Sequence, residues 1–246
     1  METIPMPGEE TPAAVNHLGR LIGVLFNPKE TFAEIARRPS WIAPLALLVI
    51  LGTGVGVLLN AKMDWHAYIR QEADKNPRFE QLSEEQKENA ISKQVGITPY
   101  FVYGAGVLNV PILLLVFALI YWGAMNLFHG AGLRYGTAFA VTAHAMTPLA
   151  ILNILALVVL PMKGRGEVDP QNIVAANVGA FLGADAPKWF SSLGGSLDLF
   201  WIWCLALAAV GFSAAVPKKI KPGAAFGTVF GLWAVWVACK VAWAAL

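Results

Sequence analysis

Residues 110–162 decide the fold of this chain: VPILLLVFALIYWGAMNLFHGAGLRYGTAFAVTAHAMTPLAILNILALVVLPM. The stretch holds one charged residue, Arg134, which lies in a short connection between two apolar runs. The hydrocarbon core of a bilayer is about 30 Å thick, so a helix of roughly 20 mostly apolar residues can cross it. The two runs extend over 99–128 and 136–162, and their tight connection predicts an antiparallel hairpin of two membrane-spanning helices.

The composition of the whole chain favours an integral membrane protein. Of the 246 residues, 57% are hydrophobic and 14% are charged, and the mean hydropathy is +0.56, which is far from the balance of soluble domains. Three more stretches are apolar and long enough to span a membrane: 41–60, 195–216 and 223–246. Lipid leaves no water for unpaired backbone groups, so all five should be helical. The predicted fold is an all-α membrane protein, a five-span transmembrane helical bundle.

Composition also argues against several functional classes. The net charge of +2, without a run of basic and aromatic residues, gives no support for nucleic-acid binding. The two cysteines, Cys204 and Cys239, lie inside apolar segments, where cysteine usually behaves as a small hydrophobic residue. The start of the chain, METIPMPGEE, lacks the basic and then apolar plan of a cleaved signal peptide. The first span is therefore expected to act as the insertion signal.

Residues 1–40 are predicted to form an N-terminal tail followed by interfacial amphipathic helices. In the first helix, one face carries apolar residues at helical spacing, and Arg20 lies on the opposite face. The apolar face consists of Val15, Leu18, Leu21, Ile22, Leu25 and Phe26. Asn27, Pro28 and Glu30 form a start signal for a second helix. The segment is expected to be a surface elbow that feeds the first span, with lipid sensing as an alternative role.

The membrane domain, 41–246, has two sizeable loops. Residues 62–96 carry charges of both signs and a capping box at Ser83 and Gln86, which predicts a small extramembrane helical element. Residues 163–194 carry a cap signal at Asp169 and then apolar residues, which predicts an interfacial helix ending near Gly183.

The positions of lysine and arginine suggest an orientation. Arg37 and Arg38 adjoin the first span, and Lys218, Lys219 and Lys221 crowd into one short loop, whereas most basic residues of the other loops alternate with acids. We expect the N-terminus inside and the C-terminus outside, in a bacterial cytoplasmic (inner) membrane.

Charged residues within spans need a physical reason, since each costs about 2.5 to 3.5 kcal/mol near the bilayer centre. Asp198 and Lys240 fall at similar depth on sequential antiparallel spans, so an ion pair between them is one hypothesis. In the alternative, Asp198 stabilises the positive end of its own helix and Lys240 extends outward to water.

The third span holds the most polar region expected within the bilayer. His144, Pro148 and Asn153 lie on it, with Asn109 on the neighbouring second span. Pro148 frees the carbonyl of His144, and a kink there could line an ion or substrate path or could be a packed joint between helices. The four histidines show no metal-ligand spacing, so no metal or cofactor is expected.

Two patterns of small residues favour close helix packing: Gly52 with Gly56, and Gly223 with Gly227 and Gly231. Internal packing is the first interpretation of both, and dimerisation is the alternative. Gly211 and Ser213 loosely resemble the serine turn of rhomboid proteases, but no histidine follows Ser213, so catalysis is not expected.

Several of these segments resemble the YIP family, the Ypt/Rab-interacting membrane proteins, and in particular its bacterial branch. They are the approach LFNPKETF at 25–32 with RPSW at 38–41, the third span with Phe139, His144 and Pro148, and DLFWIW at 198–203. The resemblance covers the chain from about Gly19 onward and implies a five-span helical domain with a cytosolic N-terminus and no known catalysis. Eukaryotic members bind Rab-type GTPases through N-terminal motifs that have no counterpart in residues 1–40, so such a partner is not expected here.

The sequence thus favours a non-enzymatic integral membrane scaffold or adaptor that organises lipids or partner proteins. The partner could be an unknown membrane protein or a second copy of the chain. Two alternatives remain open: a transporter or channel for a small solute or ion that uses the polar third span, and an accessory subunit of a larger membrane complex.

Overall fold

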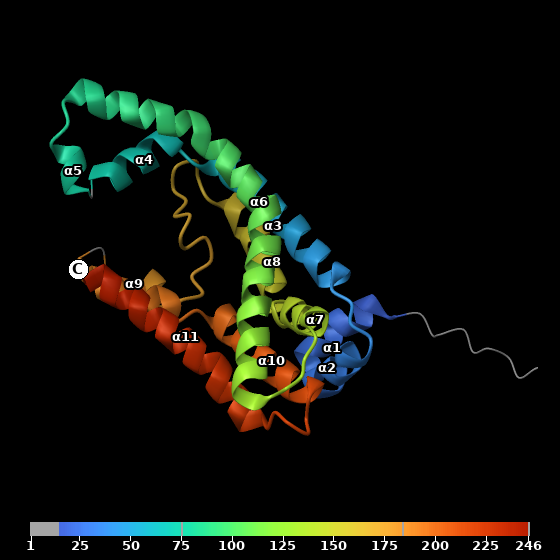
Figure 1. The fold of residues 1–246 in the computed structure, drawn as a ribbon. Helices are drawn as coiled ribbons and strands as arrows, with labels where there is room; N and C mark the ends of the chain where they lie inside the picture. The colour runs from blue at the N-terminus through green and yellow to red at the C-terminus, as the bar shows by residue number, and fades with distance from the viewer. Residues whose placement is uncertain (1–14, 75, 184, 246) are drawn as a thin grey trace, which may run out of the picture.

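The computed structural model describes residues 15–74, 76–183 and 185–245, and within them the regular structure is helical (Figure 1). The expected tail at 1–14 lies outside the described residues. Four segments are long and apolar enough to cross a membrane: α3 (Ile42–Lys62), α6 (Glu84–His129), the pair α7 (Tyr135–Ala145) and α8 (Pro148–Met162), and α11 (Pro222–Ala245). The all-helical membrane fold is confirmed.

The count of five spans remains a prediction. The expected fourth span, 195–216, forms the apolar helix α10 (Leu199–Ala215), whose 17 residues rise about 26 Å. That length is at the lower limit for crossing the hydrocarbon core.

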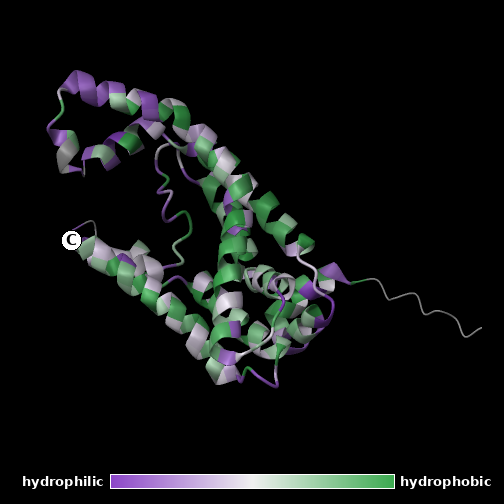
Figure 2. Ribbon diagram, in the orientation of Figure 1, coloured by the Kyte–Doolittle hydropathy of each residue, from purple (hydrophilic) through white to green (hydrophobic). Residues whose placement is uncertain are grey.

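The second span is longer than expected. The expected loop helix and the expected span fuse into α6, whose 46 residues rise about 69 Å, more than twice the thickness of the hydrocarbon core. Ser83 and Gln86 form the predicted capping box at its start. With α4 (Trp65–Asp74) and α5 (Pro77–Glu80), the first turns of α6 make an arm, defined as residues 65–74 and 76–96, that projects beyond the apolar spans and is mostly hydrophilic (Figures 1 and 2).

The N-terminal elbow is part of the bundle. Helix α1 (His17–Phe26) packs on α2 (Pro28–Arg37), and α2 packs against α10 and α7. Phe32 and Ile35 of α2 are fully buried, and the ring of Phe32 lies beside Gly211 of α10, where a side chain would collide with it. Asn27 caps α2 without a side-chain bond, and the Thr31 hydroxyl donates to the Asn27 carbonyl at 2.8 Å. The sequence predicted a surface elbow and did not predict this packing against α7 and α10.

The loop at 163–194 also differs from expectation. Asp169 accepts the amide of Gln171 in a turn and starts no helix there, and the predicted helix before Gly183 is only the 3-10 turn η1 (Val178–Phe181). Helix α9 (Lys188–Ser196) follows. The loop instead pairs with the start of α10, since the amide of Leu199 donates to the Ala176 carbonyl at 3.0 Å. Sequence periodicity missed this because the pairing joins segments about 20 residues apart.

Candidate functional site

The third span breaks where Pro148 removes a backbone donor. Helix α7 ends at Ala145 and α8 begins at Pro148. The carbonyl of His144 accepts from the Thr147 hydroxyl at 2.6 Å and from the Thr147 amide at 3.1 Å. The acceptor that Pro148 frees is therefore satisfied inside the chain, and the break is a closed joint.

The joint is dry. His144 and Thr142 are fully buried, and Thr147 is 4% exposed. The Nδ1 atom of His144 lies 2.9 Å from the Ala140 carbonyl, which can only accept, so Nδ1 donates and the second ring nitrogen, Nε2, takes no part in this bond. That Nε2 atom and the Thr142 hydroxyl are buried without a hydrogen-bond partner within the described chain. Such groups cost free energy, so tight apolar packing around them must compensate.

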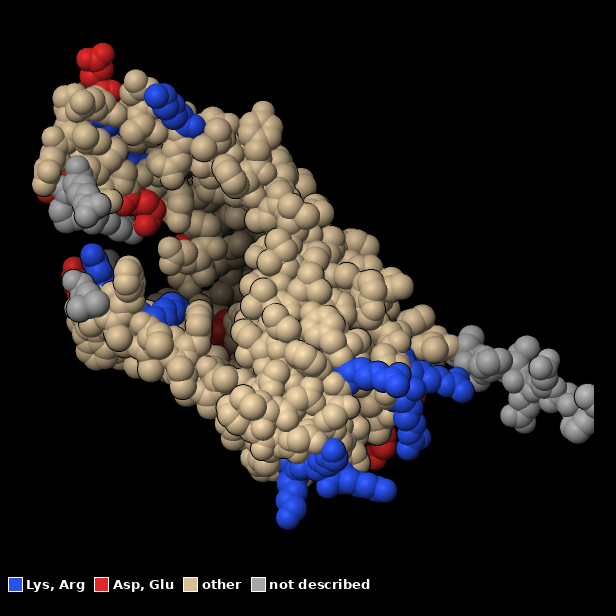
Figure 3. Space-filling model, viewed as in Figure 1, with Lys and Arg blue, Asp and Glu red and all other residues tan. Residues whose placement is uncertain are grey.

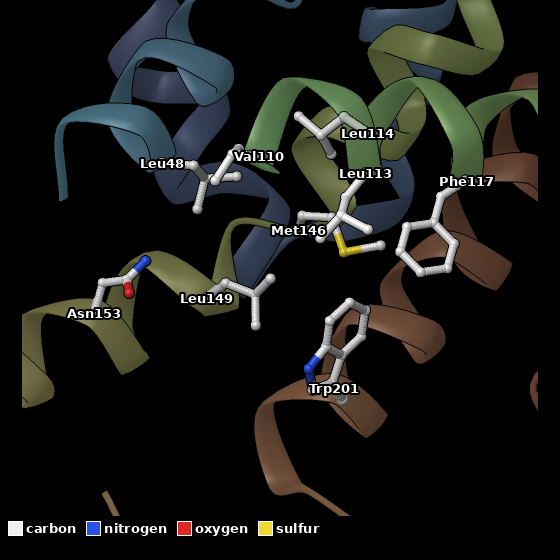
Figure 4. A pocket seen from close by; sticks show the side chains of 9 residues that line it. All are labelled: Leu48, Val110, Leu113, Leu114, Phe117, Met146, Leu149, Asn153 and Trp201. Carbon is white, nitrogen blue, oxygen red and sulfur yellow. The ribbon is translucent and has the colours of Figure 1, made fainter. Parts of the chain in front are cut away.

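The other polar residues of this region do not converge on His144. Asn109 is exposed on α6, whereas His144 is fully buried. Asn153 lines a cavity of about 60 Å³ that is otherwise apolar and that includes Met146 of the joint (Figure 4). Its lining residues are Leu48, Val110, Leu113, Leu114, Phe117, Met146, Leu149, Asn153 and Trp201. The cavity is far smaller than usual ligand pockets and is not lined by His144.

The structure does not join Asp198 and Lys240 in an ion pair. Asp198 is the N-cap of α10, and its Oδ1 accepts the amides of Phe200 and Trp201 at 2.9 and 3.0 Å. Lys240 donates to the Ser196 hydroxyl at 3.2 Å, near the C-terminal end of α9, and lies 5.4 Å from the centre of the Trp236 ring. Each charge therefore stabilises the end of a helix.

The two glycine patterns have different surroundings. Gly52 and Gly56 face α6, where Gly106 comes so close to α3 that a side chain on it would meet the Thr53 Cα at 3.1 Å. Gly106, which the sequence analysis missed, completes this helix contact. Gly223, Gly227 and Gly231 instead have open space where a side chain would be. Within the described chain they pack on nothing, contrary to the first interpretation.

Arg20 is the polar residue whose role sequence reasoning missed. Its side chain is buried between α1, α2 and the start of α3. Its Nη2 bonds Glu34 at 3.0 Å, and its Nη1 donates to the Arg38 carbonyl at 2.9 Å and to the Ser40 hydroxyl at 2.7 Å. A lone cation in an otherwise apolar helix was the available signal.

Ion pairs join α4 to α6 in the arm. His66 of α4 lies 2.9 Å from Glu88 of α6, and Arg70 lies 3.8 Å from both Glu84 and Glu88. Glu84 also accepts from Lys87 at 2.8 Å, and this hydrogen bond holds the pKa of the Glu84 carboxyl below its ordinary value. The arm is therefore a folded element with a charged surface.

Ser213, the residue considered for catalysis, donates its hydroxyl to the Val210 carbonyl of its own helix at 2.9 Å. That bond is the usual one for a serine inside a helix.

Comparison with known proteins places the chain in a family. The model of the Yip1 domain matches residues 22–244, which is nearly the whole chain from the middle of α1 to the end of α11. No curated protein and no solved structure matched the chain. The matched region contains the closed joint, the second half of α1, all of α2 and the apolar helices that follow the elbow, and the chain belongs to the Yip1 domain family.

Proposed function

We propose that this protein is a non-enzymatic membrane scaffold or adaptor whose arm binds a partner protein beside the membrane. The observation that carries the proposal is the closed joint in the third span. The freed His144 carbonyl is satisfied by Thr147, and the polar side chains of the joint are buried, which suits a rigid element better than a transport path. The arm then supplies the accessible polar surface, because it projects from the apolar bundle (Figure 2).

The closed joint argues against the transporter alternative. A transport path through the third span needs water or solute to reach polar groups at mid-membrane depth. His144 and Thr147 are buried, and the neighbouring cavity has about 60 Å³ and one polar lining residue, Asn153.

The role of an accessory subunit in a larger complex is favoured by a separate observation. Gly223, Gly227 and Gly231 face open space along α11, and small residues at this spacing allow another helix to approach closely. An adaptor that docks a neighbouring membrane helix on α11 would use this face.

We infer that the N-terminus is cytoplasmic and the C-terminus outside, in a bacterial inner membrane. The loops assigned to the outside hold nine lysines and arginines, so the position of the basic residues beside the spans, and not their number, supports this orientation. Residues 15–41, 129–135 and 216–222 hold eight. The basic ones are Arg20, Lys29, Arg37, Arg38, Arg134, Lys218, Lys219 and Lys221. In a Cys239→Ser background, an impermeant maleimide added outside should label Arg165→Cys and spare Lys218→Cys. The opposite labelling would reverse the orientation.

The partner proposal is tested by crosslinking in native membranes followed by affinity purification. A double variant of the arm, Glu85→Lys with Lys93→Glu, keeps the net charge and changes two exposed residues. It should lose a partner that the unchanged protein retains. The matched control, Glu167→Lys with Arg165→Glu on the other loop, should keep it. Recovery of lipid alone, together with solute movement by the purified protein in vesicles, would sink the scaffold proposal.

A further inference from the structure

Helix α1 points its charge inward and its apolar residues outward. Arg20 is 2% exposed and Val24 is fully buried, whereas Leu18, Ile22 and Phe26 are 67, 51 and 83% exposed. These three residues are spaced four apart and therefore form one ridge along the helix. We call Leu18, Ile22 and Phe26 the α1 ridge. This is the reverse of a helix on the surface of a soluble protein.

The buried side of α1 fixes this orientation. Arg20 is bonded to Glu34, to the Arg38 carbonyl and to Ser40, so rolling the helix would break bonds to three groups. Gly23 lies so close to α2 that a side chain on it would collide with the Thr31 hydroxyl. These contacts of Arg20 and Gly23 therefore keep the ridge exposed in the folded protein.

The α1 ridge lies at the basic end of the molecule. Exposed cations there include Lys29 and Arg37 of α2, Arg134 before α7, and Lys218 and Lys221 between α10 and α11. Figure 3 shows basic side chains gathered at this end and along the lower edge, with few acidic ones among them. Of the two acidic residues of the elbow, Glu34 is already bonded to Arg20. We call Lys29, Arg37, Arg134, Lys218 and Lys221 the basic rim.

Together the two features specify an occupant. An apolar ridge needs hydrocarbon, and the basic rim needs negative charge. A neutral lipid would leave the rim uncompensated, and an acidic soluble protein would leave the ridge against polar surface. We propose that the α1 ridge enters the adjacent leaflet while the basic rim binds anionic lipid headgroups, so that the protein retains anionic lipids around its N-terminal end. This deepens the proposed scaffold role by naming the lipid class that it would organise.

Lipid retention tests the headgroup part of the proposal. Full-length protein is reconstituted in vesicles of phosphatidylcholine and phosphatidylglycerol and extracted in mild detergent, and the retained lipids are quantified. The unchanged protein should be enriched in phosphatidylglycerol. The rim variant Lys29→Gln, Arg37→Gln, Lys218→Gln, Lys221→Gln should lower the enrichment roughly tenfold, as should high salt.

The matched control removes four cations elsewhere: Lys93→Gln, Lys163→Gln, Arg165→Gln and Lys188→Gln. It should leave the enrichment unchanged. Equal losses in both variants, or no enrichment in the unchanged protein, would overturn the proposal. Recovery of protein partners through the arm is a separate readout, so the scaffold role can fail or survive independently.

Depth measurement tests the ridge. Spin labels are placed at Ile22→Cys and, for comparison, at the exposed Glu30→Cys in a Cys239→Ser background. In vesicles, the label at 22 should collide with oxygen and be shielded from a water-soluble nickel chelate, and the label at 30 should show the reverse. A label at 22 that the chelate reaches, or one shielded from both reagents as under a protein segment, would contradict insertion into lipid.

Discussion

At the scale of single residues, the buried side chain of Arg20 holds the elbow together. The sequence predicted a polar face on α1 but not its direction, because periodicity separates the faces of a helix without saying what each one contacts. In the structure the face with Arg20 lies inside, since Glu34, Ser40 and the Arg38 carbonyl provide acceptors there. The same limit applied to Asp198 and Lys240. Their similar predicted depth in the membrane did not reveal which groups each one contacts.

Replacing Arg20 by methionine should destabilise the protein. The variant keeps much of the side-chain volume and removes the bonds to Glu34, to the Arg38 carbonyl and to Ser40, so the free energy of unfolding should fall by about 2 kcal/mol. The control is Glu34→Gln, which should cost less than about 1 kcal/mol, because Glu34 is more than half exposed and water screens its charge. Thermal or denaturant unfolding in detergent measures both. If the two variants lower the free energy of unfolding equally, the acceptors on Arg38 and Ser40 contribute nothing to stability.

At the scale of helices, local sequence predicted where apolar helices lie but not where they stop or what covers them. Hydropathy and the capping box at Ser83 are local signals: the capping box is confirmed, and four of the five predicted spans are helices long enough to cross a membrane. The fusion of the loop helix into α6 was missed because hydropathy marks only the apolar run from residue 99, whereas the helix itself continues through Pro99 and Pro111. The two glycine patterns looked alike in sequence, and only the neighbouring helices distinguish them.

A valine at Gly106 should be far more costly than a valine at Gly227. At Gly106 the new side chain would press on the backbone of α3, with a loss of about 1 to 3 kcal/mol in the free energy of unfolding. At Gly227 there is open space, so unfolding of the isolated protein should change little. Equal effects would mean that α3 and α6 are not in close contact. A loss of an oligomer in Gly227→Val would identify the α11 face as an interface.

The first turns of α6 should become less stable in acid. Glu84 lies in the arm, outside the spanning part of α6, and the Lys87 hydrogen bond lowers its pKa below 4.5. A carboxyl whose pKa is lower in the folded state stabilises that state above its unfolded pKa, and the stabilisation is lost as the pH falls through the folded value. Amide hydrogen exchange of the first turns of α6, corrected for intrinsic rates, should therefore accelerate below about pH 4. Lys87→Gln should reduce this dependence and Lys93→Gln should preserve it.

At the scale of the whole molecule, the protein has a packed end and an open end. The elbow, α7 and α10 form the packed end, and α11 meets α6 there, where His129 bonds Thr228 at 2.8 Å. Away from that contact α11 diverges from α6, and the surface between the arm and α9 with α11 is hollowed (Figures 1 and 3). This asymmetry depends on contacts between distant segments, which is why hydropathy predicted the spans without predicting the shape.

The closed joint of the polar third span should admit no water. Hydroxyl-radical footprinting of the reconstituted protein tests it without a mutation, because Met146 in the joint is 2% exposed and Met162, at the end of α8, is 81% exposed. Methionine oxidises where water delivers the radical. If the joint is closed, Met162 should oxidise rapidly and Met146 should be protected until the protein unfolds. Oxidation of Met146 at a rate similar to that of Met162 in the folded protein would reveal a hydrated path and contradict the closed joint.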